Sequence, residues 1–271
     1  MVHQLLWMAN GRAVPCVAKR TTPWEAAVYR DDLDEEVAPR LLGTAPAEAG
    51  VWLFLGLVRG EHPDFGTEAG AAEAYAALGR LHRRFARPHP APPTGHARWC
   101  VTAAQVRGAL RAAGAAPALV AEAAAWLAGG PATLVHGDFH RWNLLKSGHR
   151  LLLLDWEHAA VTHPIWDLVL AAPEEETGRD HLPCGRPAEA ALRAYHGAGP
   201  LAHLSWRRFQ RLHALARLFV AARWAAHHEA AALRAPSPAA ADVVLAYAGA
   251  ERRRQDRLIK ILTEEGREPP G

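Results

Sequence analysis

The chain has 271 residues, of which 50% are apolar and 22% are charged, and its formal net charge is +3. This composition excludes a disordered chain, and the length allows a substantial core in one or two domains. The basic residues are spread along the sequence without the interleaved aromatic residues of a nucleic-acid groove, so we expect no nucleic-acid partner.

The cysteines and the apolar runs bear on the compartment. Cys16, Cys100 and Cys184 are odd in number, far apart and without metal-ligand spacing, as is typical of reduced thiols in a cytoplasm. No apolar run approaches the roughly 18 residues of a membrane span. No basic segment precedes an apolar one at the N-terminus, as it would in a signal peptide. We therefore expect a cytoplasmic protein, monomeric or homodimeric, with no membrane partner.

The N-terminal part predicts a β-hairpin followed by a helix. Residues 2–9 and 13–19 are apolar-leaning runs joined by Asn10-Gly11, the strongest short hairpin signal. The run Thr22-Pro23-Trp24-Glu25 then supplies a capping Thr, a Pro in the first turn and a Glu three residues after the cap. Because this capping box already accounts for Glu25, a functional role for its carboxylate stays open on the residues alone.

The rest of the chain predicts one more buried strand, at 51–55, and a series of helices. A Pro- and Gly-rich linker runs from Gly60 to Gly70. The charged run at 251–254 is most simply a solvated helix face. Helices are expected near residues 71–86, 102–113, 117–129, 187–197, 205–233 and 238–264.

Residues 133–156 carry the strongest functional signal. An apolar run leads into His136-Gly137-Asp138, and Asn143 follows Asp138 by five positions. Residues 144–154 then predict a hairpin that turns at a Ser-Gly pair. This hairpin brings Asp155, which stands at its end, back beside Asn143 and Asp138.

Each of these three side chains suits one part of phosphoryl transfer. The carboxylate of Asp138 can accept a proton from a hydroxyl, while the oxygens of Asn143 and Asp155 can hold a hard cation such as Mg2+. Phosphoryl transfer needs a positioned nucleophile and metal charge on the phosphate oxygens. The spacing His-x-Asp, followed by an Asn five positions later, is that of a kinase catalytic loop.

The residues around this spacing differ from those of protein kinases. Gly137 stands in place of the usual Arg, and Asp155-Trp156-Glu157 stands in place of Asp-Phe-Gly. Only twelve positions separate Asp155 from Asp167, which leaves no room for a long activation segment. The stretch resembles the aminoglycoside phosphotransferase/choline kinase-like family of small-molecule kinases, specifically over residues 133–170 and more loosely over about 13–87.

That family also carries an Asp-Pro-x-x-Asp-Leu run. Here the run reads His163-Pro164-Ile165-Trp166-Asp167-Leu168, so its first Asp is His. This departure puts no metal-binding or base residue in doubt.

The resemblance implies an α+β, two-lobed, protein-kinase-like fold. Residues 1–58 would form a small, β-rich nucleotide-binding lobe, and residues 59–271 a large helical lobe with the catalytic loop, metal site and acceptor pocket. Lys19, at the end of the second strand, would hold the nucleotide phosphates. Its ion-pair partner would be Glu25, with Glu35 and Glu36 as rivals. Backbone groups of Leu57 and Val58, at the hinge between the lobes, would bind the base.

The resemblance also assigns roles within the catalytic unit. Asp138 would be the catalytic base, and Asn143 and Asp155 would bind Mg2+. His136 and Asp167 would support the catalytic loop. The co-substrate would be ATP or GTP.

One part of the kinase small lobe has no counterpart. That lobe normally carries a further strand and a glycine-rich loop before the hairpin, and the eighteen residues that precede Lys19 are too few for both. The expectation is either a reduced small lobe or a start codon upstream of Met1.

The leading hypothesis is therefore an Mg2+-dependent O-phosphotransferase acting on a hydroxyl of an antibiotic or a related secondary metabolite. Carboxylates such as that of Glu157 could contribute to a pocket for a cationic acceptor. Two alternatives stay open. One is a metabolic kinase for choline, homoserine or a sugar-like alcohol, and the other is an inactive nucleotide-binding protein, which the short small lobe favours.

Overall fold

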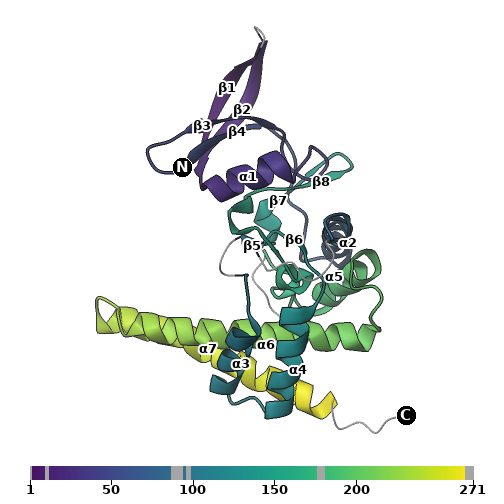
Figure 1. Ribbon diagram of the computed structural model, residues 1–271, viewed down its shortest axis with the longest axis vertical. Helices are drawn as coiled ribbons and strands as arrows, with labels where there is room; N and C mark the ends of the chain where they lie inside the picture. The colour runs from purple at the N-terminus through teal and green to yellow at the C-terminus, as the bar shows by residue number, and fades with distance from the viewer. Residues whose placement is uncertain (1, 10–11, 87–93, 96–98, 176–180, 266–271) are drawn as a thin grey trace. The chain divides into compact units, whose positions relative to one another are not determined.

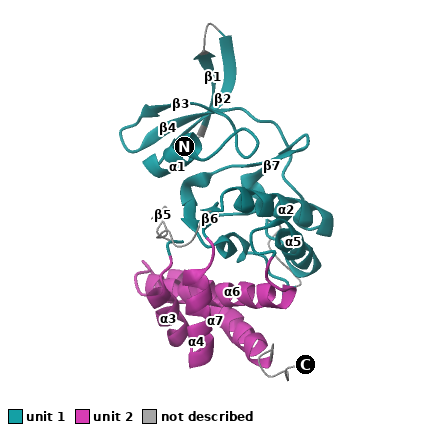
Figure 2. Cartoon of the chain, turned by 45° about the vertical axis from the view of Figure 1, so that its right-hand side comes forward, with its two compact units in different colours: residues 1–87, 92–100, 132–202 teal, residues 88–91, 101–131, 203–271 magenta. Residues whose placement is uncertain are grey.

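The computed structural model describes residues 2–9, 12–86, 94–95, 99–175 and 181–265 (Figure 1). An antiparallel sheet is followed by a mostly helical part, so the predicted α+β class is confirmed. The contacts between residues divide the chain into two compact units (Figure 2). Unit 1 comprises residues 1–87, 92–100 and 132–202, and unit 2 comprises residues 88–91, 101–131 and 203–271. The predicted lobe boundary at residue 58 divides the chain differently and stays a prediction.

The N-terminal sheet of unit 1 has four antiparallel strands in the order β1-β2-β4-β3. They are β1 (Val2–Ala9), β2 (Arg12–Thr21), β3 (Leu41–Pro46) and β4 (Val51–Gly56). Ala9 pairs with Arg12, as the predicted hairpin requires, and the two turn residues lie outside the described residues. Strand β3 was not predicted. Its Gly43 leaves room for the ring of Trp7, since a Cβ there would lie 2.9 Å from that ring.

One face of this sheet packs on helix α1 (Pro23–Asp31) and presents Lys19. The predicted Thr22 cap forms, because its side chain accepts the Glu25 N–H at 3.2 Å, but the box is not completed: the Glu25 carboxylate bonds Lys19 and the Trp156 N–H instead. Lys19 pairs with Leu53 across β2 and β4, so these two side chains share a face. Leu53 and Val28 are buried between the sheet and α1. The ammonium of Lys19 therefore lies beside the first turn of α1.

Around residues 136–143, the described remainder of unit 1 consists of two α-helices, short 3-10 turns and short pieces of sheet. Helix α2 (Glu68–Arg84) packs along α5 (Gly185–Ala198), and Gly79 permits their close approach because a Cβ there would lie 3.0 Å from the Tyr195 carbonyl. The predicted hairpin is confirmed as β7 (Leu144–Ser147) and β8 (Arg150–Leu153). The other elements are β5 (Thr94–Gly95), β6 (Thr133–Val135), β9 (Ala160–Thr162), η1 (Arg141–Asn143), η2 (Trp156–His158) and η3 (Pro164–Leu168).

Unit 2 is helical and holds four of the predicted helices, each within about two residues of its expected bounds. They are α3 (Ala103–Ala112), α4 (Pro117–Gly129), α6 (Trp206–Ala232) and α7 (Pro238–Glu265). The long helices α6 and α7 lie side by side in Figures 1 and 2. No helix among the described residues is both long enough and apolar enough to cross a membrane. The run at 251–254 is a solvated helix face only in part: Arg252 and Arg253 are exposed, whereas Glu251 is buried and pairs with Arg254.

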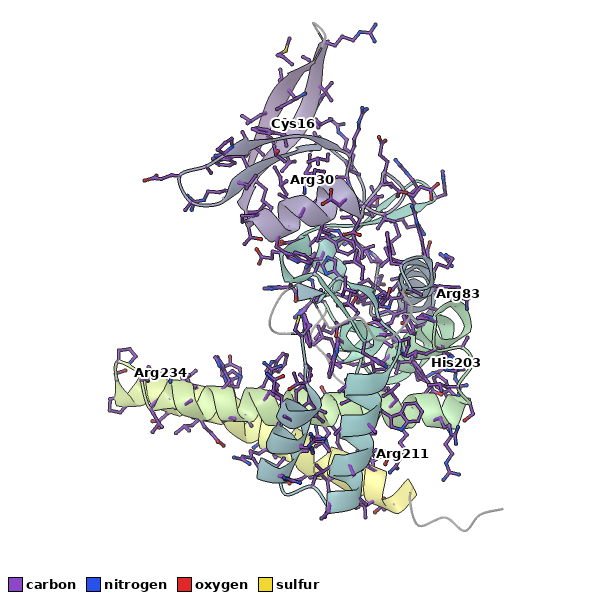
Figure 3. The ribbon with its side chains drawn as sticks, viewed as in Figure 1. Cys16, Arg30, Arg83, His203, Arg211 and Arg234 are labelled. Carbon is purple, nitrogen blue, oxygen red and sulfur yellow. The ribbon has the colours of Figure 1, made fainter. Side chains whose placement is uncertain are left out.

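Arg211 joins three of these helices (Figure 3). Its guanidinium donates to both oxygens of Glu122 on α4, at 2.6 and 2.7 Å, and to the Leu262 carbonyl on α7 at 3.0 Å. The Arg211 and Glu122 side chains are 26% and 28% exposed. Arg252 and Glu229 form a similar pair between α7 and α6, but these side chains are 49% and 41% exposed.

We expect Arg211→Ala to lower the free energy of unfolding in urea by about 1–2 kcal/mol, because a partly buried, charge-assisted pair is lost. Arg252→Ala is the matched control and should cost less than about 0.5 kcal/mol, since water screens an exposed pair. Equal losses in the two variants would mean that burial does not distinguish these pairs.

Candidate active site

The predicted catalytic loop begins where β6 ends, at His136-Gly137-Asp138. Gly137 has a φ of +80°, and a Cβ at this position would lie 2.2 Å from the His158 carbonyl oxygen and 2.6 Å from Trp99 Nε1. The Trp99 indole N–H donates to the Gly137 carbonyl at 2.8 Å. Because both the backbone conformation and the space exclude a side chain, only glycine fits here.

The buried carboxylate of Asp167 fixes the start of this loop through two hydrogen bonds. Its oxygens accept the N–H groups of His136, at 2.7 Å, and Gly137, at 2.6 Å. Asp167 lies in η3, whose first turn is capped by His163: the Nδ1 atom of that ring accepts the Ile165 N–H at 3.1 Å. Histidine thus supplies a capping acceptor at the position where the family run has Asp.

Asp138 follows directly and lies within a group of histidines and Asn143. The Asn143 amide donates to the Asp138 carbonyl at 3.0 Å and to its carboxylate at 3.2 Å, and His140 Nε2 lies 3.3 Å from the same carboxylate oxygen. Burial works to raise the pKa of Asp138. The hydrogen bond and charge of His140, with His136 and His158, outweigh it and hold this pKa below its ordinary value. The carboxylate is therefore ionised at neutral pH.

A second group of charges joins β2, α1 and the end of the β7–β8 hairpin. The Lys19 ammonium lies 2.8 and 3.0 Å from the two oxygens of the fully buried Glu25, and it also pairs with Asp155. Burial pulls the pKa of Lys19 down, but these two carboxylates outweigh it, so its pKa lies above the ordinary value. Glu25 also accepts the Trp156 N–H at 2.9 Å.

The geometry thus selects Glu25 as the ion-pair partner of Lys19. Its rivals are occupied elsewhere: Glu35 lies 3.4 Å from Arg40, and Glu36 lies 3.7 Å from Arg84. The sequence favoured Glu25 only weakly because the capping box explained it. In the structure the Glu25 N–H takes part in the cap while its carboxylate reaches Lys19.

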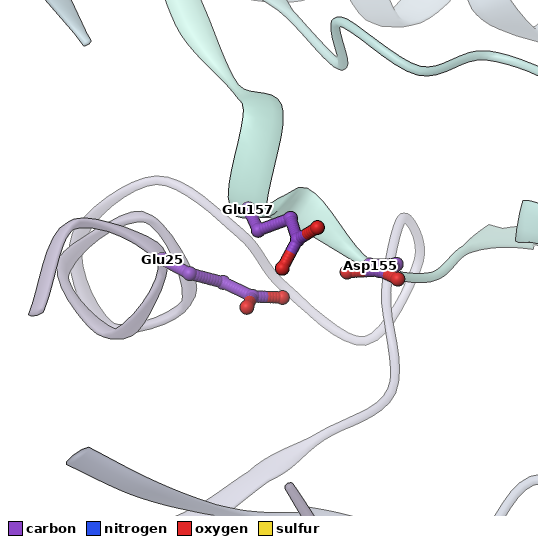
Figure 4. Close-up of side chains that lie close together, drawn as sticks. All are labelled: Glu25, Asp155 and Glu157. Atoms are coloured by element: carbon purple, nitrogen blue, oxygen red, sulfur yellow. The ribbon is translucent and has the colours of Figure 1, made fainter. Parts of the chain in front are cut away.

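Asp155 adopts a left-handed conformation, with a φ of 64°, and is the one non-glycine residue with positive φ among those described. The side chains of Glu25, Asp155 and Glu157 converge, each offering an oxygen within 4.8 Å of the others (Figure 4). Hairpin pairing continues to the Leu154 N–H, which donates to the Asn143 carbonyl at 2.8 Å. Asn143 itself turns its amide nitrogen toward Asp138. Two groups result, Asp138 with Asn143 and Lys19 with Glu25 and Asp155.

The hinge and acceptor candidates are also located. The Leu57 N–H already donates to the Pro15 carbonyl at 3.0 Å, extending the sheet, so any base contact by Leu57 would use its carbonyl. Val58 follows in irregular backbone. Glu157 is half-exposed and lies 3.5 Å from His158.

Sequence reasoning missed three residues that contact the site. They are Trp99, which touches Gly137, His140, which touches Asp138, and His82, whose Nε2 lies 3.0 Å from Asp167. His140 stands only two positions after Asp138, and that nearness was the available signal. Among sixteen histidines it did not stand out.

The fold and this constellation of residues define a small-molecule phosphotransferase with a kinase-like fold. The model of the phosphotransferase enzyme family matches residues 14–209, and the chain belongs to that family. No curated protein matches the chain in sequence.

Three solved structures illustrate the shared fold. A choline/ethanolamine kinase family protein from Mesorhizobium loti has a TM-score of 0.56 at 20% identity, over 95% of this chain and 92% of that one. A choline kinase from Cryptosporidium parvum Iowa II has a TM-score of 0.54 at 11% identity, over 98% and 91%. A thermostable mutant of aminoglycoside phosphotransferase APH(4)-Ia, in ternary complex with AMP-PNP and hygromycin B, has a TM-score of 0.51 at 15% identity, over 96% and 93%.

We expect Gly137→Ala to lower the free energy of unfolding by roughly 3 kcal/mol or more, because its Cβ would overlap backbone and ring atoms. Gly148→Ala is the matched control, since Gly148 also has positive φ (+62°) but a Cβ there would have no atom within 4 Å. That variant should cost only about 1 kcal/mol. Urea unfolding of both variants checks the difference, and equal costs would refute the steric argument.

Proposed function

We propose that the protein transfers the γ-phosphoryl group of ATP or GTP, with Mg2+, to a hydroxyl of a small molecule. The observation that carries this proposal is the joint bonding of Lys19 by Glu25 and Asp155. It places the ammonium that would bind phosphates beside the carboxylate that would bind the metal. AMP-PNP and hygromycin B in the complex of the aminoglycoside phosphotransferase named above support a nucleotide and a small-molecule acceptor.

The donor set fits Mg2+. Carboxylates of Asp155 and Glu157 and the amide oxygen of Asn143 are hard oxygen ligands, and the Asp155 and Glu157 side chains are 43% and 44% exposed, so a hydrated ion can reach them. We assign metal binding to Asn143 and Asp155, with Glu157 as a further acidic neighbour. The bound ion would neutralise charge on the phosphate oxygens.

Lys19 would bind the phosphates. In the described state its charge is matched by Glu25 and Asp155, and the buried Glu25 holds the ammonium beside the first turn of α1. An ammonium that is already positioned loses less conformational freedom when phosphates bind. The hinge residues Leu57 and Val58 would bind the base through their backbone groups.

Asp138 would orient the acceptor hydroxyl and accept its proton. The oxygen of the hydroxyl forms the new bond to the γ-phosphorus, the bond from that phosphorus to the β–γ bridging oxygen breaks, and the nucleoside diphosphate leaves. The hydroxyl proton passes to the Asp138 carboxylate. Since the transition state is loose, the proton leaves late and a carboxylate of low pKa can serve. Alignment of the hydroxyl with the phosphorus is then the larger part of the role of Asp138.

For the acceptor we propose an antibiotic or a related secondary metabolite. The half-exposed carboxylate of Glu157, two residues after Asp155, suits a cationic group on such a molecule. A metabolic amino alcohol of the choline type is the second candidate, favoured by the similarity to two solved choline or ethanolamine kinase structures. The presence of Asp138, Asn143, Lys19 and Asp155 in bonded positions argues against an inactive protein.

A phosphorylation screen tests this function. The protein would be incubated with Mg2+, ATP or GTP, and a library that pairs aminoglycosides and other hydroxylated antibiotics with choline, ethanolamine, homoserine and sugars. We expect a mass increase of one phosphoryl group on an antibiotic-type acceptor. Transfer to choline or ethanolamine alone would select the second candidate, and no transfer by a protein that binds nucleotide would favour the inactive alternative.

The roles of the two aspartates predict different defects. Asp138→Asn keeps the shape of the side chain but removes its charge and basicity, so kcat should fall by ~10²–10⁴-fold, while Mg-nucleotide binding survives. Asp155→Ala should abolish both turnover and Mg2+-dependent nucleotide binding. Titration of nucleotide into each variant, followed by kcat at saturating nucleotide, separates the two. The assignment would be reversed if Asp138→Asn lost nucleotide affinity as fully as Asp155→Ala and kept its kcat.

A further inference from the structure

A buried chain of hydrogen bonds runs from helix α5 through helix α2 to the catalytic loop. The Tyr195 hydroxyl lies 2.8 Å from His82 Nδ1, and His82 Nε2 lies 3.0 Å from an Asp167 carboxylate oxygen. The same oxygen accepts the His136 N–H at 2.7 Å. The side chains of His82 and Asp167 are fully buried, as is Tyr195. The chain therefore ends on the backbone that carries Asp138.

When the His82 ring is neutral, the donors and acceptors in this chain have a fixed direction. An ionised carboxylate only accepts, so the Nε2 atom of His82 must carry a proton and donate it to Asp167. In the neutral imidazole the other nitrogen, Nδ1, is then an acceptor, which the Tyr195 hydroxyl satisfies as donor. Burial raises the pKa of Tyr195 well above its ordinary value, and Asp167 adds to the effect, so this hydroxyl keeps its proton.

We propose that Tyr195 is a positioning residue for the phosphoryl transfer: its hydroxyl fixes the tautomer of His82, and through Asp167 it fixes the catalytic loop. When the hydroxyl is removed, the buried Nδ1 atom of His82 either stays without a hydrogen-bond partner or takes the proton from Nε2. In the second case Nε2 presents a lone pair to the Asp167 carboxylate. The hydrogen bond from His82, the third that this carboxylate accepts, is then replaced by repulsion between Nε2 and the carboxylate oxygen.

Asp167 would respond by shifting, and the loop would follow it. Both carboxylate oxygens are bonded to consecutive N–H groups, those of His136 and Gly137, and Asp138 is the next residue. Since phosphoryl transfer depends mainly on positioning, a small displacement of Asp138 lowers kcat more than it lowers nucleotide binding. In this respect the inference rests on the proposed function.

A second buried tyrosine, Tyr75, serves as a matched control for Tyr195. Tyr75 is fully buried on α2, and its ring contacts Phe139 beside Asp138 at a centroid distance of 5.1 Å. Its hydroxyl has no hydrogen-bond partner among the described residues. Tyr75→Phe thus removes the same atom from an equally buried site without breaking a bond.

The test compares Tyr195→Phe and Tyr75→Phe in the full chain, first without any substrate. The 15N NMR signals of His82 should report the Nε2–H tautomer in the wild type and in Tyr75→Phe, and a mixture of tautomers in Tyr195→Phe. Amide exchange of His136 and Gly137 should accelerate by about threefold or more in Tyr195→Phe only, the equivalent of one lost hydrogen bond. An imidazolium in the wild type, or unchanged tautomer and exchange in Tyr195→Phe, would overturn the inference.

Kinetics with the acceptor found in the screen supply the second readout. Tyr195→Phe should lower kcat by about three- to tenfold and leave the KM for nucleotide unchanged, and Tyr75→Phe should change neither. His82→Gln keeps an N–H donor toward Asp167 but presents no Nδ1 atom to Tyr195. In that background Tyr195→Phe should have little further effect on kcat.

An equal loss of kcat from Tyr195→Phe in both backgrounds would assign the effect to packing alone and refute the role. If no acceptor is found, the proposed function fails, while the NMR and exchange experiments still decide whether Tyr195 sets the tautomer and the loop.

Discussion

The position of the proposed catalytic loop depends on one buried carboxylate, that of Asp167. Its two oxygens take the N–H groups of His136 and Gly137, and one of them also bonds His82. A buried charge is costly unless several donors satisfy it, and here three N–H groups do so. These donors and this acceptor need one another, because removing either side leaves buried polar groups without partners. The bonds of Asp167 to His136 and Gly137 therefore also fix the position of Asp138, the next residue, and of Asn143, which bonds Asp138.

The second set of constraints gathers the charged side chains that surround the proposed phosphate site. Lys19 comes from β2, an inner strand of the sheet, Glu25 from the first turn of α1, and Asp155 from the end of the β7–β8 hairpin. Their ion pairs join these three elements around one ammonium group. Glu25 also bonds the Trp156 N–H, which fixes the backbone after the left-handed Asp155. The left-handed backbone at Asp155 is thus held both by the Glu25 carboxylate, through the next N–H group, and by the pairing of its own side chain with Lys19.

Much of the secondary structure could be predicted because its signals are local. The pairing of β1 with β2, the Thr22 cap, the β7–β8 hairpin and the long helices each depend on residues close to one another in the sequence. Strand β3 could not be predicted in this way. Its residues include Gly43 and Pro46, which disfavour strands, and it is extended because it pairs with β4.

In the candidate site, too, the residues with local signals could be predicted, and those that depend on distant contacts could not. Spacing and residue chemistry indicated Asp138, Asn143 and Asp155, since these lie in one short stretch. The partner of Lys19 was uncertain among three glutamates until geometry selected Glu25. The contact between His82 and Tyr195 gave no signal, because it joins positions 113 residues apart in the sequence. A buried histidine is recognised by what surrounds it, and a sequence alone does not state its surroundings.

The discontinuity of both compact units has a consequence for synthesis on the ribosome. Unit 1 needs residues up to 202, and unit 2 combines residues 101–131 with the C-terminal helices, so neither can be finished while only the N-terminal half has emerged. The pairing of Lys19 with Asp155 spans 136 positions, and closing so long a loop costs entropy before any contact repays it. During synthesis, Lys19 and Glu25 therefore remain without Asp155 until more than half of the chain has left the exit tunnel.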